Sequence, residues 1–331
     1  MLHLASLVGL MLFYPLILVM PIDDALAADD FTYLETIDAL SLQDWTIIDT
    51  RDAGVCASKT LAGARCLPVS DFMGPHGRMA GFADIAWLLG TAGIDGSEQV
   101  LIIGQQPSQR DFVAGVLHVM GQRQIAVLRQ PVAKLVSTNL TSAAGGIQRS
   151  KTRLKVYMAP ARSEHVIFAR ELDQRIVVAG GVKLLDGRSE AEYWGKNVRT
   201  TRGGHLPGAD HLPAKTLRSS LARGEYPGPS PNQGQVVVYA HGPFEGYAYY
   251  TLVRAGLGLD ATVFADGWAA WAASARHVDA ATYPEQKLSL PAGAPSTKFD
   301  SMSFTLIAMF MGLLMLVMLG LGIVIGRRRT A

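Results

Sequence analysis

A pattern of apolar run, loop and helical segment occurs twice in this chain of 331 residues and limits the folds open to it. The first copy has VLIIG at residues 100–104 followed by RDFVAGVLHVMG, and the second has VVVYA at residues 236–240 followed by GYAYYTLVRAGL. Short continuous apolar runs that alternate with helices are typical of parallel strands buried on both faces. Because the connections between such strands are right-handed, each copy predicts a small α/β domain with a parallel sheet flanked by helices.

Each copy also contains similar elements around this core. We interpret FTYLETIDALSLQDW and SEHVIFARELDQR as helical segments that precede the strands in TIIDTRD and VKLLDGRSEAEYWG, and IAVL and ATVF as the last strands. Repeats of this length indicate duplication of a whole domain. We therefore predict one domain at residues 30–136 and a second at residues 156–283, joined by the Ser-, Thr- and Gly-rich linker 137–155.

The two ends of the chain are apolar and predict membrane targeting. Residues 304–325 carry no charge and would extend about 33 Å as a helix, enough to cross the hydrocarbon core of a bilayer. We predict a transmembrane helix at residues 304–326, with the arginine-rich tail 327–331 in the cytoplasm. Residues 1–27 predict a signal peptide cleaved after Ala27, the alternative being an uncleaved anchor.

Both outcomes place the two domains on the periplasmic or extracytoplasmic side of the cell membrane, and cleavage of the signal peptide would leave a single membrane-spanning segment. Residues 284–303 are polar and contain proline, which predicts a stalk or, alternatively, an arm packed on the second domain. The formal net charge of +2 is close to neutral and gives no reason to expect nucleic acid as a partner. In this oxidising location Cys56 and Cys66 can form a disulfide; the alternative is two small buried apolar side chains.

Two stretches of the second copy, LLDGRSEAEYWG and GGHLPGADHLP within residues 184–213, resemble the rhodanese family. In that family an Asp-x-Arg at a strand end is followed by an aromatic residue and then by Gly-His-Ile-Pro-Gly-Ala. The residues that fall on this pattern are Asp186, Arg188, Glu192, Tyr193, Gly204, His205, Pro207, Gly208 and Ala209. ADGWAAW, with Gly267 and Trp268, resembles the closing Asp-Gly-Gly-Trp motif of the family, with Asp266 in place of its first glycine.

The first copy matches the same pattern more weakly, through Asp49, Arg51, Gly63, Ala64 and Pro68. The roles of some motif residues can be argued from their spacing alone. Arg188 and Glu192 are one helical turn apart, so we expect them to pair, and Gly208 permits a backbone turn that a side chain would block.

The resemblance implies a tandem sulfurtransferase that moves sulfane sulfur from thiosulfate or mercaptopyruvate to a thiophilic acceptor. Its nucleophile would be a cysteine directly after the apolar strand of the second domain. Here Ala240 occupies that position, and Gln105 occupies the corresponding one in the first copy. Neither side chain can form a persulfide, because that chemistry needs a thiolate.

The loop after the second apolar strand remains the candidate ligand site. It contains a carboxylate, Glu245, which we expect to repel an anionic substrate such as thiosulfate. The candidate residues are Ala240, His241, Gly242, Pro243, Phe244, Glu245, Gly246 and Tyr247.

Two further groups of residues are weaker candidates. Three histidines, His205, His211 and His241, lack the spacing of metal ligands, so we expect no metal, and no motif calls for another cofactor. The aromatic residues Phe244, Tyr247, Tyr249 and Tyr250 could line a pocket, although their helical spacing favours packing in the core.

The sequence therefore predicts a membrane-anchored rhodanese-like protein that serves as a noncatalytic binding or scaffold module for an envelope protein. One alternative is an enzyme, either a sulfurtransferase or another transferase or hydrolase that uses His241 and Glu245 as acid and base. Another is a sensor that binds a small sulfur anion without chemistry. The link to sulfur chemistry depends on the family resemblance.

Overall fold

The computed structural model of the chain describes residues 30–37, 41–137, 143–177, 182–225 and 235–280, which form part of one compact unit. The predicted signal peptide, stalk, transmembrane helix and cytoplasmic tail lie outside these residues. Within them, no helix is both long enough and apolar enough to span a membrane.

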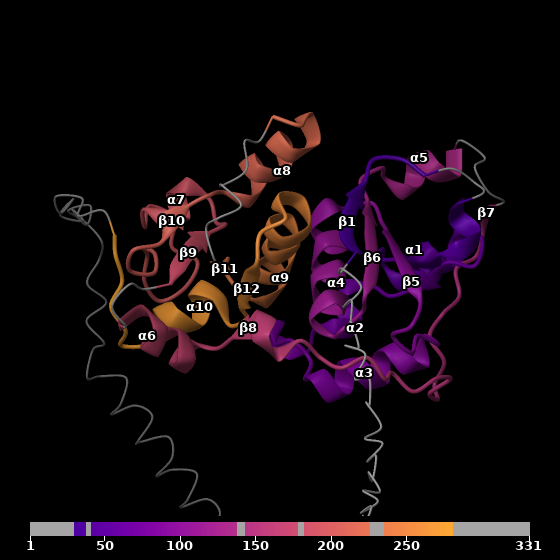
Figure 1. Cartoon of the computed structure of the whole chain (residues 1–331), viewed down its shortest axis with the longest axis horizontal. Coiled ribbons are helices and arrows are strands. Elements are labelled where there is room, and N and C mark those ends of the chain that lie inside the picture. Colours follow the sequence, from indigo (N-terminus) through magenta and orange to yellow (C-terminus); the bar gives the residue numbers. More distant parts are fainter. Residues whose placement is uncertain (1–29, 38–40, 138–142, 178–181, 226–234, 281–331) are drawn as a thin grey trace, which may run out of the picture. The chain divides into compact units, whose positions relative to one another are not determined.

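Two five-stranded sheets with the same strand order form the framework (Figure 1). The first has the order β1 (Asp30–Leu34), β6 (Gln124–Leu128), β5 (Gln99–Ile103), β2 (Thr46–Asp49) and β4 (Arg65–Cys66). The second has the equivalent order β8 (Val166–Ile167), β12 (Ala261–Phe264), β11 (Val236–Tyr239), β9 (Lys183–Asp186) and β10 (Asp210–His211). All neighbouring strands within each sheet are parallel. This confirms the predicted α/β class with two parallel sheets.

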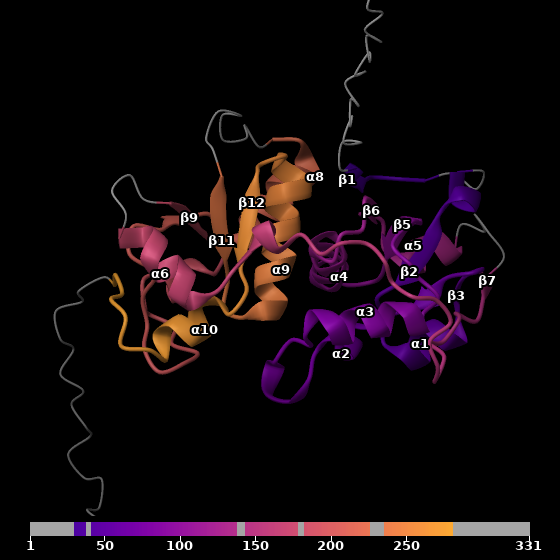
Figure 2. The ribbon, with the colours of Figure 1, turned by 60° about the horizontal axis from the view of Figure 1, so that its bottom comes forward.

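Helices flank both sheets (Figure 2). In the first half of the described chain they are α1 (Ala53–Ser58), α2 (Val69–Phe72), α3 (Phe82–Thr91), α4 (Pro107–Val119) and α5 (Val132–Ser137). In the second half they are α6 (Ala169–Val177), α7 (Glu190–Tyr193), α8 (Ala214–Arg223), α9 (Pro243–Thr251) and α10 (Gly267–Ala272). Short 3-10 turns lie at Ser41–Asp44, Pro75–Gly77 and Ser163–His165, and a π-helical turn at Leu252–Gly256 extends α9.

Two segments that we expected to be helical contain edge strands instead. The described residues of the first, FTYLETIDALSLQDW, form most of β1 and one 3-10 turn, so the helix prediction was wrong there. The second, SEHVIFARELDQR, forms a 3-10 turn and β8 before α6 begins at Ala169. Aromatic and β-branched residues favour a pleated, half-buried surface, and both strands consist largely of such residues.

The Asp-x-Arg pairs end equivalent strands, β2 and β9, with nearly the same geometry. Arg188 Nη2 lies 2.5 Å from Asp186 Oδ2 and donates to the carbonyl of Gly204 over 2.8 Å. In the first half, Arg51 Nη2 lies 2.6 Å from Asp49 Oδ2 and donates to the carbonyl of Lys59 over 2.7 Å. In each half the arginine therefore fastens the end of a central strand to a later segment of the chain.

Glu192 does not pair with Arg188 as we expected. It instead forms a capping box with Ser189 at the start of α7: the Ser189 hydroxyl accepts from the Glu192 N–H, and the Glu192 carboxylate accepts from the Ser189 N–H. Such reciprocal capping satisfies two N–H groups that have no partner within the helix. Gly208 has a φ of +70°, which agrees with the turn predicted for it.

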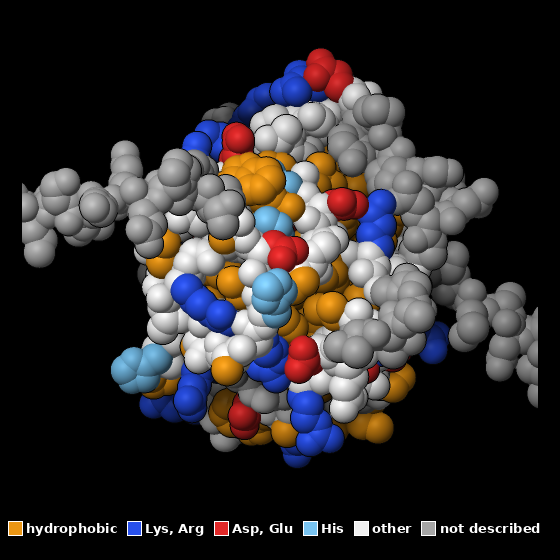
Figure 3. All heavy atoms as spheres, turned by 90° about the vertical axis from the view of Figure 1, so that its left-hand side faces the viewer, with side chains coloured by type: hydrophobic (Ala, Val, Ile, Leu, Met, Phe, Trp, Pro, Cys, Tyr) orange, Lys and Arg blue, Asp and Glu red, His pale blue; other side chains and the backbone are white. Residues whose placement is uncertain are grey.

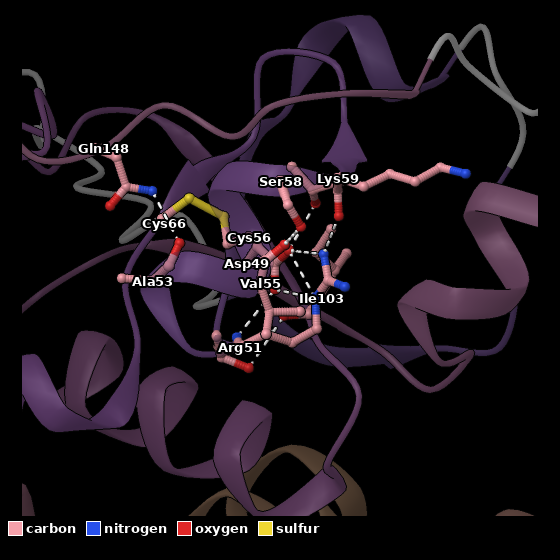
Figure 4. Close-up of a disulfide and its surroundings, with 12 residues drawn as sticks. Asp49, Arg51, Ala53, Val55, Cys56, Ser58, Lys59, Cys66, Ile103 and Gln148 are labelled. Carbon is pink, nitrogen blue, oxygen red and sulfur yellow. Dashed lines mark hydrogen bonds and ion pairs between the residues drawn. A yellow bond between two sulfur atoms is a disulfide. The ribbon is translucent and has the colours of Figure 1, made fainter.

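A disulfide joins Cys56 of α1 to Cys66 of β4, with the Cα atoms 5.8 Å apart (Figure 4). Both cysteines are buried, and the backbone of Gly146 lies directly over the two sulfur atoms. This glycine belongs to the predicted linker. From residue 143 onward that segment packs on the first half, because β7 (Ala143–Ala144) pairs with β3 (Thr60–Leu61) and Ile147 exchanges backbone hydrogen bonds with Ala64 and Cys66.

Helices α4 and α9 join the two halves through a close backbone contact. A Cβ atom at Gly115 would lie 2.6 Å from the carbonyl oxygen of Tyr247 and 2.8 Å from Oγ1 of Thr251. The same hydroxyl donates to the carbonyl of Asp111 over 2.7 Å, and the rings of Phe112 and Phe244 lie 5.3 Å apart. The absence of a side chain at residue 115 therefore sets how closely the helices approach.

We expect Gly115→Ala to destabilise the protein by about 1–3 kcal/mol, because the added methyl group forces α4 and α9 apart. Urea denaturation measures this loss. Gly54→Ala is the matched control, since it also places alanine in a helix but nothing lies within 4 Å of the added atom. There we expect no loss, or a gain of roughly 0.5–1 kcal/mol. Equal effects of the two substitutions would contradict the close contact.

His118 of α4 is also buried at this contact, where its Nδ1 lies 2.8 Å from the hydroxyl of Tyr250. Burial lowers the pKa of His118 from 6.5 to about 2. Between these two pH values the unfolded chain binds a proton that the folded chain does not, so stability falls as the pH falls. Its contribution is complete above pH 6.5.

We expect wild type to lose about 1.6 kcal/mol more than His118→Gln between about pH 6.5 and pH 5, because the slope approaches about 1.4 kcal/mol per pH unit only below pH 6. Urea denaturation at the two pH values tests this. His277→Gln, at an exposed histidine, is the control and should keep the wild-type pH dependence. Parallel curves for wild type and His118→Gln would show that His118 is protonated in the folded protein.

Candidate functional site

The candidate loop turns directly from the end of β11 into α9, which begins at Pro243. Two backbone hydrogen bonds fix it to α10: Trp268 N–H donates to the carbonyl of Ala240 over 2.9 Å, and Ala269 N–H donates to that of His241 over 2.8 Å. Gly267 has a φ of +66°, and a Cβ atom there would lie 2.9 Å from the loop backbone. The closing motif predicted from the sequence therefore holds the loop in place.

The positions expected for a nucleophile hold no nucleophile in either half. Ala240 is buried in the second half, whereas Gln105 is exposed in the first. In the first half, Arg110 of α4 is buried and donates to the carbonyls of Gly104 and Gln130 over 3.2 Å, which closes that loop from within. Burial lowers the pKa of Arg110.

Arg199 connects two carboxylates near the loop. It was not among the site residues predicted from the sequence. Its guanidinium donates to Glu245 over 2.8 Å and to Glu192 over 3.1 Å. It belongs to the irregular stretch KNVRTTRGG, where no spacing marks one arginine above another. The hydrogen bond to Glu245 raises the pKa of Arg199. The negative charge of Glu245, which we expected to repel anions, is thus offset by a paired cation.

His241 faces the same carboxylates but makes no direct hydrogen bond with them. Its Nδ1 is buried, lies 3.9 Å from Oε1 of Glu192, and has no hydrogen-bond partner within the described part of the chain. Burial, together with the charge of Arg199, lowers the pKa of His241, so the ring is neutral near pH 7. Although burial raises the pKa of Glu192, hydrogen bonds from Ser189 and Arg199 hold it below its ordinary value.

A cleft of about 1020 Å³ opens beside this loop, between residues of the two halves. Its size is at the upper end for small-molecule sites in proteins. Most of its wall is apolar, with a few charged and polar groups among the apolar ones. The apolar residues include Met73, Met79, Phe82, Phe168, Phe244 and Tyr247, and the polar ones are His76, Arg78, Arg199, His241, Glu245 and Asp266.

The aromatic residues that we weighed as pocket or core divide between the two. Phe244 and Tyr247 line the cleft, although Tyr247 is otherwise buried. Tyr249 and Tyr250 are fully buried in the core. Of the four aromatic residues considered from the sequence, two therefore line the cleft and two pack in the core.

His205 and His211 lie on either side of Tyr193 and away from the cleft lining. Their ring centroids are 3.7 Å and 4.5 Å from that of Tyr193, in stacked arrangements. The Tyr193 hydroxyl donates to the carbonyl of Ala209 over 2.6 Å. Among the described residues, no group of histidine, cysteine, aspartate or glutamate is arranged to hold a metal ion. The histidines of the motif thus support the fold.

The charges of the second half are mixed on the side that Figure 3 shows. Acidic and basic side chains alternate there around apolar areas, without a continuous basic surface. This side of the second half therefore carries no strong field of one sign.

Comparison with known proteins supports the fold. Residues 168–274 match the rhodanese-like domain family, and no curated protein matches the chain. A probable thiosulfate sulfurtransferase of known structure is 22% identical, with a TM-score of 0.52 over 72% of this chain and 98% of its own. The structure of YnjE is 15% identical, with a TM-score of 0.56 over 72% of this chain and 62% of its own.

A third structure is EanB with ergothioneine covalently linked to a cysteine persulfide. It is 14% identical, with a TM-score of 0.58 over 73% of this chain and 65% of its own. This chain thus spans slightly less than two-thirds of both YnjE and EanB. At such identities the similarity shows the fold alone. The described part of the chain has the rhodanese fold, and residues 168–274 of its second half match the rhodanese-like domain family.

We expect Arg199→Ala to raise the pKa of His241, because the substitution removes a cation that disfavours the imidazolium and frees two carboxylates that favour it. The pKa of Glu192 should rise as well. The pH titration of the His241 ring signals by NMR measures the change. Arg223→Ala is the control, because Arg223 pairs with the exposed Glu225 and, among the described residues, with no other carboxylate. An unchanged His241 midpoint would mean that Arg199 does not lie near the loop in solution.

Proposed function

We propose that this protein is a membrane-anchored rhodanese-like binding module that holds a ligand or an envelope protein partner without transferring sulfur. The anchor and the extracytoplasmic location rest on the two apolar end segments of the sequence. One observation carries the noncatalytic assignment. The whole sequence contains two cysteines, and both are bonded to each other. No thiolate remains to carry a persulfide.

The position of the disulfide supports the same conclusion. Cys56 and Cys66 lie in α1 and β4 of the first half, and neither lines the cleft. Even as free thiols they would be remote from the loop that follows β11. The loop itself presents the methyl group of Ala240 where the family has its cysteine.

The cleft supports binding as the function that remains. Its apolar walls supply buried contact area, and His241, Arg78 and Asp266 supply polar groups that can orient a ligand. Arg78 and Asp266 form no ion pair within the described residues, so both side chains are free to contact a ligand. A small sulfur anion is one ligand that this chemistry allows, through Arg78, and a side chain of a protein partner is another.

A rival function is acid–base catalysis by His241 and Glu245. His241 supports it, because the ring is neutral near pH 7 and its buried Nδ1 has no hydrogen-bond partner. The pairing of Glu245 with Arg199 opposes it, since a general base must reach its proton within about 2.6–3.2 Å and its carboxylate is already engaged. Replacing His241 or Glu245 would abolish the rate of such an enzyme but could at most weaken binding by a module.

We expect the purified protein to produce no thiocyanate from thiosulfate or mercaptopyruvate and cyanide, with or without a reductant that frees the two cysteines. Ala240→Cys should gain a persulfide on incubation with thiosulfate, because its thiol would lie at the start of α9, where a helix N-terminus favours the thiolate. Intact-protein mass spectrometry detects the added sulfur.

Gln105→Cys is the control, since it places a thiol after the equivalent strand but beside the loop that Arg110 closes. We expect no stable persulfide there. Turnover by the wild-type protein that Cys56→Ser or Cys66→Ser abolishes would overturn the noncatalytic assignment. Turnover that survives both substitutions would show that another residue performs the chemistry.

A further inference from the structure

An extended segment of the first half, residues 151–158, runs along α3 and is called the strap below. In both ribbon views it follows α3 on its way from β7 toward β8 (Figures 1 and 2). The N–H groups of Leu154 and Lys155 both donate to the carbonyl of Gly90, and the N–H of Met158 donates to that of Asp95. These hydrogen bonds fix the strap on the surface and determine which side chains face outward.

Alternate side chains of the strap point toward the protein and toward solvent. Lys155 forms ion pairs of 2.8 Å with Asp95 and Glu98, and Tyr157 is buried. Three of its exposed residues are large and apolar, with Leu154 60%, Val156 50% and Met158 75% exposed. They alternate with Lys155 and Tyr157, so one side of the strap presents apolar side chains to water.

Trp87 of α3 extends this apolar surface. It lies one helical turn before Gly90, the residue covered by the strap, and is 48% exposed. Exposed apolar side chains that are clustered instead of scattered mark a surface that contacts something else. Four large apolar side chains from the strap and α3 therefore need an explanation beyond chance exposure.

Basic residues border the apolar row. Lys151 and Arg153 are exposed, and neither forms an ion pair with any described residue. The side chain of Arg153 lies against Gly90, the residue to which the strap is hydrogen-bonded, so its positive charge is carried on the same surface as the apolar side chains. On α3 the exposed carboxylate of Asp84 precedes Trp87 by one turn, and Lys155 is paired with Asp95 and Glu98, so among these residues the positive charges outside an ion pair are those of Lys151 and Arg153.

We propose that the strap and Trp87 bind the interface of an anionic lipid bilayer. Tryptophan and aliphatic side chains partition into the headgroup region, and basic residues next to them attract anionic lipid. Residues 281–303 separate the described unit from the predicted transmembrane segment, and fully extended they reach roughly 80 Å. This tether is long enough to bring the strap to the same bilayer. The proposal is independent of whether the cleft binds a ligand.

The test uses the full chain in nanodiscs, one set of phosphatidylcholine alone and one containing phosphatidylglycerol. We expect amide hydrogen exchange of residues 151–158 to be several-fold slower in the anionic discs. We also expect Trp87 fluorescence, taken as the difference between wild type and Trp87→Phe, to be quenched by brominated lipid. Both effects should weaken as salt is added, because surface charges are screened.

Two double variants separate the contributions. Leu154→Ser with Met158→Ser should abolish the quenching, and Lys151→Glu with Arg153→Glu should abolish the preference for anionic discs. The matched control is Val198→Ser with Lys215→Glu, an exposed pair in the second half that should leave both signals unchanged. Equal exchange in the two kinds of disc would overturn the proposal. So would protection that appears only after another envelope protein is added, which would identify the strap as a protein-binding surface.

Discussion

The buried ion pair between Asp186 and Arg188 holds together the parts of the second half that shape the cleft. Both side chains are almost fully buried, and charges in such a place are tolerated only when they are paired and fully hydrogen-bonded. The Arg188 guanidinium satisfies this by bonding Asp186 at the end of β9 and the carbonyl of Gly204 beyond α7. It also lies 4.4 Å above the ring of Trp268 in α10. The N–H of Trp268 donates to the carbonyl of Ala240. Trp268 therefore links the candidate loop to the buried ion pair.

The first half has the same ion pair but a different consequence. Arg51 fastens Asp49 to the segment that carries the disulfide (Figure 4), and no tryptophan motif follows β6. The loop after β5 is instead closed by Arg110 from its own helix. One half thus keeps a loop open to a cleft, whereas the other fills the equivalent place with an arginine side chain. The shared strand order shows that this difference lies in side chains and not in topology.

Much of this arrangement could be predicted from the sequence. The runs VLIIG and VVVYA are apolar at every position before the glycine or alanine. A continuous apolar run of this length is the pattern expected of a strand buried on both faces. The Asp-x-Arg spacing predicted two strand ends correctly. The edge strands were missed, since DFTYL is short and half-exposed, and its Phe31 stacks on the ring of His118 from α4. That contact joins residues far apart in the chain, which local periodicity cannot reveal.

The site was predictable as a loop but not as a charge arrangement. The sequence identified Ala240, His241 and Glu245 because they follow a recognisable strand. It did not identify Arg199, whose position depends on how an irregular segment folds back over α7 and α9. With Glu245 alone the loop would be acidic, and with Arg199 present the pair is neutral. The packing of the predicted linker on the first half could not be predicted for a similar reason, because glycine and serine indicate freedom of the backbone and give no information about what it packs against.

That packing matters at Gly146, whose backbone covers the sulfur atoms of Cys56 and Cys66. Neither an oxidant nor an oxidoreductase of protein size can reach sulfur atoms beneath a docked backbone. The bond is therefore made before residues 145–147 dock. Once they have docked, the same backbone shields the bond from oxidoreductases of protein size, so the order of oxidation and docking decides whether the disulfide can form.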